Sequence, residues 1–320
     1  MSPLWKTRNF ATSAHQRLLN LAHAEGIEFN LLLQRYTAER FLYRLSVSQE
    51  VDRFVLKGAA LLRVWTEREL RPTRDIDFLA LQSEDRAEIR MAMESICNIA
   101  CPEDGVVFDP TTIQINNIRG AGHFSGLRAR LRGNLGRARL ALKIDIGFGD
   151  VVTPEPEVRN YPTLLDLPAP RLWTYPRETM VAEKFHAMVS LGESNSRVKD
   201  LWDIACLARL FAFGGETLRT AIAETFRRQQ TSLGSERPLA LLPDYYRDGM
   251  RVQHWTKLRN GIDPDIEGPI MLTDAGKEVR RFLGPTCDSL IAGSPFRQEW
   301  PAGGPWRSGN EAGTGGDAND

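Results

Sequence analysis

FVLKGAALLRVWTERELRPTRDIDFLAL, residues 54–81, is the segment that decides how the rest of the chain is organised. Its apolar ends, Phe54–Leu56 and Phe78–Leu81, predict two short strands. Lys57–Gly58 ends the first strand, and the apolar run that follows predicts a helix over Ala59–Thr66. The segment therefore predicts a strand, a tight turn, a helix and a second strand.

Two carboxylates introduce the second strand. Asp75 and Asp77 are two positions apart, and residues i and i+2 of a strand point to the same face. Ile76 and Phe78 would then face the core. Two neighbouring carboxylates repel each other unless a cation lies between them, and Mg²⁺ is the usual hard cation beside substrate phosphates. A solvated acidic strand edge would have the same pattern, so the pair alone does not decide between a metal site and an ordinary surface.

A third carboxylate lies in the strand predicted over Arg139–Phe148, RLALKIDIGF, whose apolar and polar residues alternate. Asp145 is on the less apolar face, beside Lys143 and the small Gly147. We expect Asp145 to lie opposite the Asp75 and Asp77 pair as a third metal-binding acid, with Gly147 leaving room for a ligand. The alternative is an exposed face that carries a lysine–aspartate pair.

The composition narrows the class of protein. The chain has 320 residues, 26% of them charged, and a formal net charge of zero, so any nucleic-acid contact must come from local basic clusters. The spacing of the four cysteines predicts neither a disulfide framework nor a zinc site. No signal peptide and no apolar run of about 18–20 residues is present, so we expect a cytoplasmic protein with no membrane contact.

The order of patterns predicts an α+β (mixed α/β) fold. We expect N-terminal helices over 1–50, an α/β core with a mixed sheet over 51–170, a helical C-terminal domain over 171–290 and a disordered tail over 291–320. The expected helices are Thr12–Ala24, Glu28–Leu45, Ser83–Ile99, Glu178–Leu191, Val198–Phe211, Glu216–Gln230, Trp255–Arg259 and Asp274–Leu283. Further strands are expected at Val106–Phe108, Thr112–Ile118 and Gly126–Leu131, and 151–167 is expected to be irregular.

Charged residues also gather on two helices of the C-terminal half. Lys184 lies on the first, and Asp200 and Asp203 share one face at the start of the second. Lys184 would reach either a phosphate or Asp200. The two acids would otherwise be simple partners of the helix dipole.

These motifs together resemble the AbiEii-type nucleotidyltransferase toxins, a branch of the DNA-polymerase-β-like nucleotidyltransferase superfamily. The resemblance covers roughly residues 28–230 and rests on FVLKGAALL, RPTRDIDF, LKIDIGFGD and ETMVAEKFHAMVSLGESNSRVKDLWDI, in the family's order. One departure is Ala59, which stands where many nucleotidyltransferases have a second glycine or a serine. A missing serine hydroxyl removes one phosphate contact, although alanine still permits close approach of backbone amides.

The resemblance implies a toxin of a toxin–antitoxin operon that transfers nucleotides from an NTP, with Mg²⁺ or Mn²⁺, to the 3′ end of tRNA and so blocks translation. The implied partners are the NTP, tRNA and a cognate antitoxin. The implied catalytic residues are Asp75, Asp77, Asp145, Lys57, Lys184 and Asp200, and the first three of these would hold the metal. The implied nucleotide- and phosphate-binding residues are Lys57, Gly58, Arg74, Lys184, Arg197, Lys199 and Asp203.

A group of arginines would bind the acceptor. Their near alternation predicts a basic stripe on one face, which suits nucleic-acid phosphates; an ordinary solvated sheet face is the alternative. Two other functions stay open: transfer to a protein or a small molecule, and a non-catalytic nucleotide-binding module. The arginines are Arg128, Arg130, Arg132, Arg137 and Arg139.

Overall fold

The computed structural model describes residues 9–82, 84–119 and 125–308, and it confirms the α+β class. The chain divides into two compact units. The predicted N-terminal helices belong to the same unit as the sheet, and the second unit is the helical part of the chain. Unit 1 comprises Met1–Asp150 with Glu155–Pro176, and unit 2 comprises Val151–Pro154 with Arg177–Asp320.

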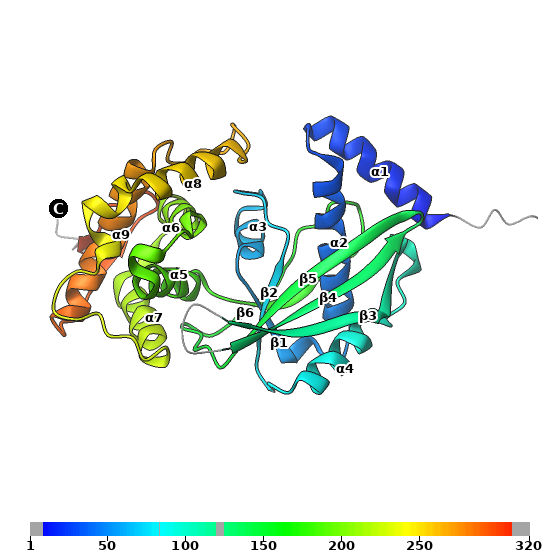
Figure 1. Cartoon of the computed structure of the whole chain (residues 1–320), viewed down its shortest axis with the longest axis horizontal. Helices are drawn as coiled ribbons and strands as arrows, with labels where there is room; N and C mark the ends of the chain where they lie inside the picture. Colours follow the sequence, from blue (N-terminus) through cyan, green and yellow to red (C-terminus); the bar gives the residue numbers. More distant parts are fainter. Residues whose placement is uncertain (1–8, 83, 120–124, 309–320) are drawn as a thin grey trace, which may run out of the picture. The chain divides into compact units, whose positions relative to one another are not determined.

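Unit 1 is built on a mixed seven-stranded sheet with the order β3-β4-β5-β2-β1-β7-β6 (Figure 1). The pairs β2–β5 and β1–β7 are parallel, and the other neighbours are antiparallel. The strands are β1 (Phe54–Lys57), β2 (Ile76–Ala80), β3 (Val106–Arg119), β4 (Ser125–Leu135), β5 (Ala138–Phe148), β6 (Glu157–Asn160) and β7 (Arg171–Thr174).

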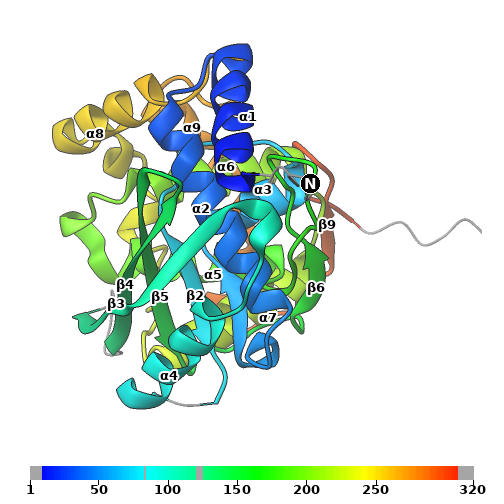
Figure 2. The same ribbon diagram turned by 90° about the vertical axis from the view of Figure 1, so that its right-hand side faces the viewer.

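One face of this sheet is covered by helices. In β5 the side chains of Leu140, Leu142, Ile144, Ile146 and Phe148 are buried, and the residues between them are partly or fully exposed, as the alternation predicts. α2 packs on β5, α4 packs on β3, and these helices contact each other, so both lie on the apolar face (Figures 1 and 2). The helices of this unit are α1 (Phe10–Glu25), α2 (Phe29–Ser46), α3 (Ala60–Thr66) and α4 (Arg86–Cys97), with 3₁₀ turns η1 (Val51–Arg53) and η2 (Pro102–Asp104).

A buried ion pair ties α2 to the start of β3. Arg44 Nη1 donates to Asp104 Oδ2 at 2.7 Å, and Arg44 Nη2 donates to the carbonyl of Val106 at 2.7 Å. Phe41 of α2 meets Phe108 of β3 edge-on, with ring centroids 5.8 Å apart. Removing either charge would leave its partner buried and unpaired, so the pair fixes where the helix sits.

Two features of the sheet differ from the sequence expectation. The two strands expected on either side of Pro110 are one strand, β3, because a register shift between Asp109 and Gln114 accommodates the proline. The segment expected to be irregular contains β6, which pairs with β7 at the sheet edge. This short edge strand was not predicted because the prolines on both sides of it indicate an irregular segment.

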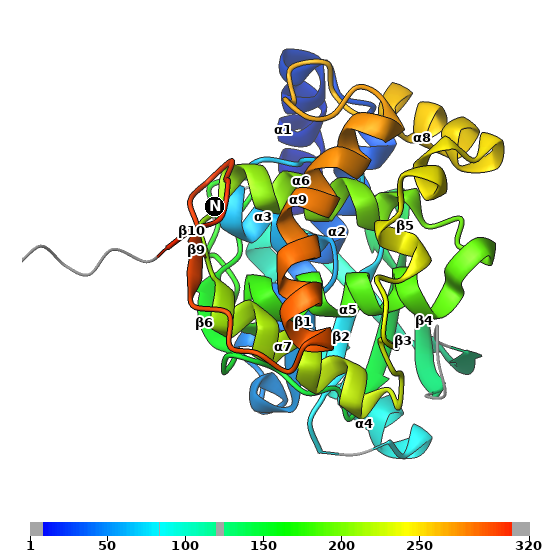
Figure 3. The ribbon, with the colours of Figure 1, turned by 90° about the vertical axis from the view of Figure 1, so that its left-hand side faces the viewer.

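Unit 2 is a group of helices with a small sheet (Figure 3). α9 packs against α6, α7 and α8, and α5 packs against α6 and α7. The described helices are α5 (Arg177–Leu191), α6 (Val198–Leu210), α7 (Gly215–Arg228), α8 (Gly249–Asn260) and α9 (Leu272–Ile291), with 3₁₀ turns η3 (Gly192–Ser194), η4 (Leu239–Leu241) and η5 (Pro243–Arg247). The three-stranded sheet, in the order β10-β9-β8, contains β8 (Phe213–Gly214), β9 (Gln298–Trp300) and β10 (Arg307–Ser308).

The end of the chain corrects two expectations. α9 continues through Pro285, where the sequence predicted a stop at Leu283. The expected disordered tail is wrong for residues 293–308, because β9 and β10 form there and Trp300 is 3% exposed. Trp306 stacks on Phe282 of α9, with ring centroids 5.8 Å apart, so a few aromatic side chains order a segment rich in glycine. Residues 309–320 lie outside the described residues.

Candidate active site

A row of charged residues crosses four neighbouring strands of unit 1. Lys57 of β1 is the register partner of Asp77 of β2, Asp77 is the partner of Asp145 of β5, and Asp145 is the partner of Arg128 of β4. Register partners on neighbouring strands point to the same face, here the one that α2 and α4 leave open. The structure therefore brings Asp77 and Asp145 side by side, as the sequence predicted.

Basic side chains of the same face hold two of the three predicted acids. Arg128 donates from Nε to Asp145 Oδ1 at 2.7 Å and from Nη2 to Asp145 Oδ2 at 2.6 Å, a bidentate pair. Lys143 Nζ forms an ion pair with Asp75 Oδ2. The pKa of Arg128 is raised, chiefly by its hydrogen bonds to Asp145 and also by the charges of Asp75 and Asp77. The charges of all three predicted acids therefore stabilise the charged guanidinium of Arg128.

Lys57 is held at the end of the row. Its Nζ donates to Asp150 Oδ2 at 2.7 Å, and it lies 5.1 Å from the ring centroid of Tyr175. A Cβ atom on Gly147 would lie 3.3 Å from Asp150 Oδ2 and 3.7 Å from Lys57 Nζ. The absence of a side chain at Gly147 thus leaves room for this ion pair.

Gly58 is required by the carboxylate beside it. Its φ is +72°, a left-handed conformation that favours glycine. A Cβ atom there would lie 2.1 Å from Asp77 Oδ2 and 2.9 Å from Asp77 Cβ. Rotating the carboxylate would not relieve the second contact. The turn after β1 therefore approaches Asp77 as closely as a backbone can.

The donor chemistry of the row suits a hard divalent cation. In the described part of the chain, no three side chains of Asp, Glu, His or Cys are grouped closely enough to hold a metal ion. Mg²⁺ typically takes one or two carboxylates and fills its other positions with water and substrate phosphates. Asp77 and Asp145 supply that number, and carboxylate oxygens are the ligands that Mg²⁺ prefers. The role of Asp75 as a third ligand stays a prediction.

The predicted arginine stripe continues from this row. Arg128, Arg130 and Arg132 alternate along β4, and Arg130 and Arg132 are exposed. Arg130 is the register partner of Lys143, and Asn134 is the partner of the exposed Arg139, so these residues share the face of the acids. Arg137 lies in the turn between β4 and β5. The stripe is confirmed as a geometric feature, and its binding role stays a prediction.

The predicted residues of unit 2 form a second cluster. Lys184 of α5 donates to Asp200 Oδ1 at 2.8 Å and pairs with Asp203 Oδ2 at 2.7 Å, so it reaches Asp200 as one alternative predicted. Asp200 and Asp203 are 3% and 0% exposed, so both are buried beside Lys184; Asp200 also lies in the first turn of α6, where its charge suits the helix dipole as the other alternative predicted. Arg197, whose side chain is 52% exposed, pairs with Asp200 at 2.7 Å, and Lys199 is exposed on α6.

Sequence reasoning missed the residues that hold the predicted ones in place. Asp150 pairs with Lys57 and follows the recognised strand within LKIDIGFGD, but nothing in its spacing indicates that partner. Lys143 pairs with Asp75 on the neighbouring strand. Finding either partner requires the register of the sheet. Arg74, a predicted phosphate ligand, is exposed in the segment before β2.

Comparison with known proteins identifies the protein family to which these motifs belong. A family model described as "Nucleotidyl transferase AbiEii toxin, Type IV TA system" matches residues 40–277. A search of the curated proteins finds no match. The crystal structure of JHP933 from Helicobacter pylori is similar, with a TM-score of 0.47, 14% identity, and coverage of 83% of this chain and 95% of that one. A second H. pylori structure, assigned provisionally as a nucleotidyltransferase, has a TM-score of 0.46, 14% identity and coverage of 83% and 98%.

Proposed function

The chain belongs to the AbiEii nucleotidyltransferase toxin family, and on this premise we propose that it transfers nucleotides from an NTP to the 3′ end of tRNA and so blocks translation. The observation that carries the proposed chemistry is the row of Lys57, Asp77, Asp145 and Arg128 on one open sheet face. The family's description as a type IV toxin–antitoxin system implies an antitoxin partner.

In the proposed reaction, the 3′ hydroxyl of the acceptor attacks the α-phosphorus of the NTP. A new oxygen–phosphorus bond forms, the bond from the α-phosphorus to the bridging oxygen breaks, and pyrophosphate leaves with the electron pair. Asp145 accepts the hydroxyl proton. Both of its oxygens already accept from Arg128, but each has a second lone pair that can accept another hydrogen bond.

The remaining residues of the row stabilise phosphate charge. Mg²⁺ held by Asp77 and Asp145, with Asp75 as a further ligand, would neutralise charge that builds up in the transition state. Lys57 and the backbone amide of Gly58 lie on the other side of Asp77 and supply positive charge and a hydrogen-bond donor.

We extend the proposal to the cluster of unit 2. Arg197 and Lys199 are exposed and would contact phosphates directly. Lys184 and Asp200, the remaining proposed catalytic residues, are buried with Asp203, so their positions are tightly held before any substrate binds. A group held in this way loses little freedom when a nucleotide binds.

The acceptor would lie along the arginine stripe. Arg128, Arg130 and Arg132 recur at every second position on the exposed side of β4, next to the row of acids. A strand spaces such side chains by about 6.6–6.8 Å, so the arginines form a line of positive charge that suits the phosphates of a nucleic acid. This continuity between stripe and acids supports a nucleic acid over a small-molecule acceptor.

The test incubates the protein with Mg²⁺, total tRNA and each α-³²P-labelled NTP in turn, beside an Asp77→Ala variant. We expect label in the tRNA band with wild-type protein and none with Asp77→Ala. Label in a protein band would replace the tRNA proposal with protein modification. Absence of label with every NTP, from a folded protein that still binds nucleotide, would leave a binding module.

A further inference from the structure

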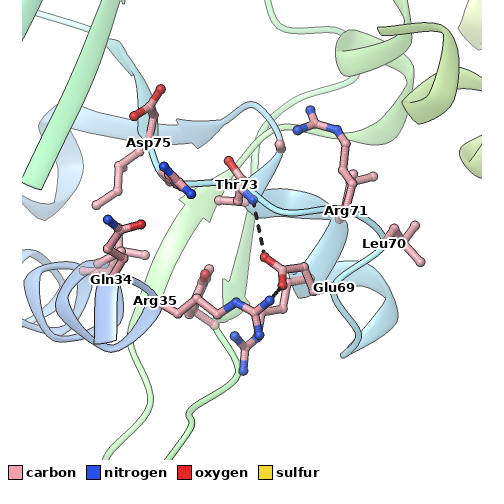
Figure 4. Close-up of a pocket in the computed structure, with 16 residues that line it drawn as sticks. Gln34, Arg35, Glu69, Leu70, Arg71, Thr73 and Asp75 are labelled. Carbon is pink, nitrogen blue, oxygen red and sulfur yellow. Dashed lines mark hydrogen bonds and ion pairs between the residues drawn. The ribbon is translucent and has the colours of Figure 1, made fainter. Parts of the chain in front are cut away.

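A pocket in unit 1 brings Arg74, which the family resemblance implies as a phosphate ligand, together with Arg35 and Arg63, which lie outside the recognised motifs. It lies between α2, α3 and the segment that leads into β2, and it is partly open to solvent. Figure 4 shows Arg35 and Arg71 on opposite sides, with Asp75 at the edge. Its ionisable lining residues other than Tyr161 are Arg35, Arg63, Arg71, Arg74, Glu69 and Asp75.

The lining of this pocket carries an excess of positive charge. Four arginines face two acids, so the formal balance is +2. Glu69 forms an ion pair with Arg35 and also accepts from the backbone N–H of Thr73 at 3.4 Å (Figure 4). Asp75 is paired with Lys143 of β5, which is not part of the lining. Among the described residues, Arg63 and Arg74 form no ion pair, so their charges are not offset by a carboxylate in contact with them.

Burial makes this excess unfavourable when the pocket holds only water. The Arg35 side chain is 12% exposed, and its Nε has no hydrogen-bond partner; the Oε1 atom of Gln34 beside it also has none. Burial, followed by the charge of Arg63, lowers the pKa of Arg35 to about 10. Two partly desolvated guanidinium groups therefore repel each other across the pocket. A bound anion would relieve that repulsion and would accept a hydrogen bond from the unpaired Nε of Arg35.

The shape of the lining favours one class of anion. Guanidinium groups bind tetrahedral oxyanions through pairs of parallel hydrogen bonds, and arginine is the residue that most often recognises phosphate in this way. The lining also contains small apolar residues, Ala38, Ala59 and Ala60. Ala59 directly follows Gly58, and Asp75 precedes Asp77 by two positions, so the pocket adjoins the row of acids.

We propose that this arginine pocket binds a phosphate group of a transferase substrate, which rests on the proposed function and adds a subsite to it. Arg63 and Arg74 are the phosphate ligands, and the Arg35–Glu69 pair orders the floor of the pocket. The phosphate comes either from the triphosphate of the NTP or from the backbone of the acceptor. Both sources present the same phosphate group to the pocket. If the phosphate belongs to the NTP, the arginines control the KM for NTP; if it belongs to the acceptor, they control the KM for tRNA.

Binding is measured first without any transfer reaction. Tripolyphosphate is titrated calorimetrically, in EDTA, into the wild-type chain, the Arg63→Gln/Arg74→Gln variant and an Arg68→Gln control. Arg68 is exposed, lies in the same region of sequence and does not line the pocket. We expect binding to weaken at least tenfold in the double variant and less than twofold in the control. No binding by wild type, or equal binding by the double variant, would overturn the pocket.

Two further measurements separate the possible failures. Arg74 is exposed, so Arg74→Gln alone keeps the test available if the double variant does not fold. In the labelled transfer assay, a raised KM for NTP identifies the triphosphate as the source, and a raised KM for tRNA identifies the acceptor. Unchanged values of both would overturn the pocket although transfer itself proceeds. Tripolyphosphate binding that depends on the arginines, without transfer by wild type, would overturn the proposed function alone.

Discussion

The open row of unit 1 and the buried cluster of unit 2 use the same residue types under opposite conditions. In the row, the side chains of Arg128 and Asp145 are 27% and 20% exposed, and they lie on an open sheet face. In the cluster, Lys184 is 10% exposed, and Asp200 and Asp203 are 3% and 0% exposed. Both regions pair cations with acids, but only in the second are the acids almost completely removed from solvent.

This difference decides what each region can do. A pair on the surface gains little free energy, because water and salt compete for both partners, so exchanging one partner for a substrate costs little. A buried pair cannot be broken without leaving a charge out of water. We therefore expect the row to exchange its partners during the reaction and the cluster to keep its arrangement.

Removing the lysine of the buried cluster should have the largest effect. Lys184→Met leaves Asp203 buried without its lysine partner and leaves Asp200 paired with Arg197. The expected loss is about 3–5 kcal/mol in the free energy of unfolding, as for other broken buried pairs. This loss is measured by urea unfolding. The fluorescence of the buried tryptophans, including Trp202 of α6, reports the transition.

Lys257→Met provides the matched control, because Lys257 is exposed on α8. Its free energy of unfolding should change by less than about 0.5 kcal/mol. Equal losses from the two lysine variants would show that the cluster is not the rigid element described above.

The sequence predicted the parts of the row that depend on local pattern. Period-two alternation placed Asp145 opposite the apolar face of its strand, and the two-residue spacing placed Asp75 and Asp77 together. It did not predict that Asp77 and Asp145 are direct register partners, because register depends on packing between segments far apart in the chain.

Long-range packing also explains the misses. Pro285 lies inside α9, where tertiary contacts of the helix outweigh the local cost of proline. Trp300 and Trp306 order residues that composition alone predicts to be disordered. The arginine pocket as a whole was not predicted, because Arg35 and Arg63 come from α2 and α3 and lie outside the motif that contains Arg71 and Arg74.

A substitution at Gly58 tests how strongly the reaction depends on the position of Asp77 in the row. Gly58→Ala places a Cβ atom against Asp77 and also requires a left-handed backbone, so we expect about 1–2 kcal/mol of lost stability. Asp77 must move to accommodate the methyl group, and a displacement of about 1 Å at a reacting centre can lower the rate about 100-fold. The labelled transfer assay and urea unfolding measure the two effects.

Gly26→Ala separates strain from displacement. Gly26 has a φ of +65° and nothing within 4 Å of the position of its Cβ, so it shares the backbone strain without the clash. It should lose about 1 kcal/mol, the cost of the left-handed backbone alone, and keep its transfer activity. Similar activity losses at both glycines would mean that strain, and not the position of Asp77, limits the reaction.

The smallest effect on stability is expected at Arg128. Arg128→Gln removes the bidentate pair with Asp145, yet both partners are partly exposed, so the free energy of unfolding should fall by no more than about 1 kcal/mol at low salt. In 1 M NaCl, where the Debye length is about 3 Å, that difference should shrink below detection. The loss from Lys184→Met should persist in the same buffer, because salt screens buried charges poorly. A loss at Arg128 that approaches the loss at Lys184, or that resists salt, would show that the row is as rigid as the cluster and cannot exchange its partners as proposed.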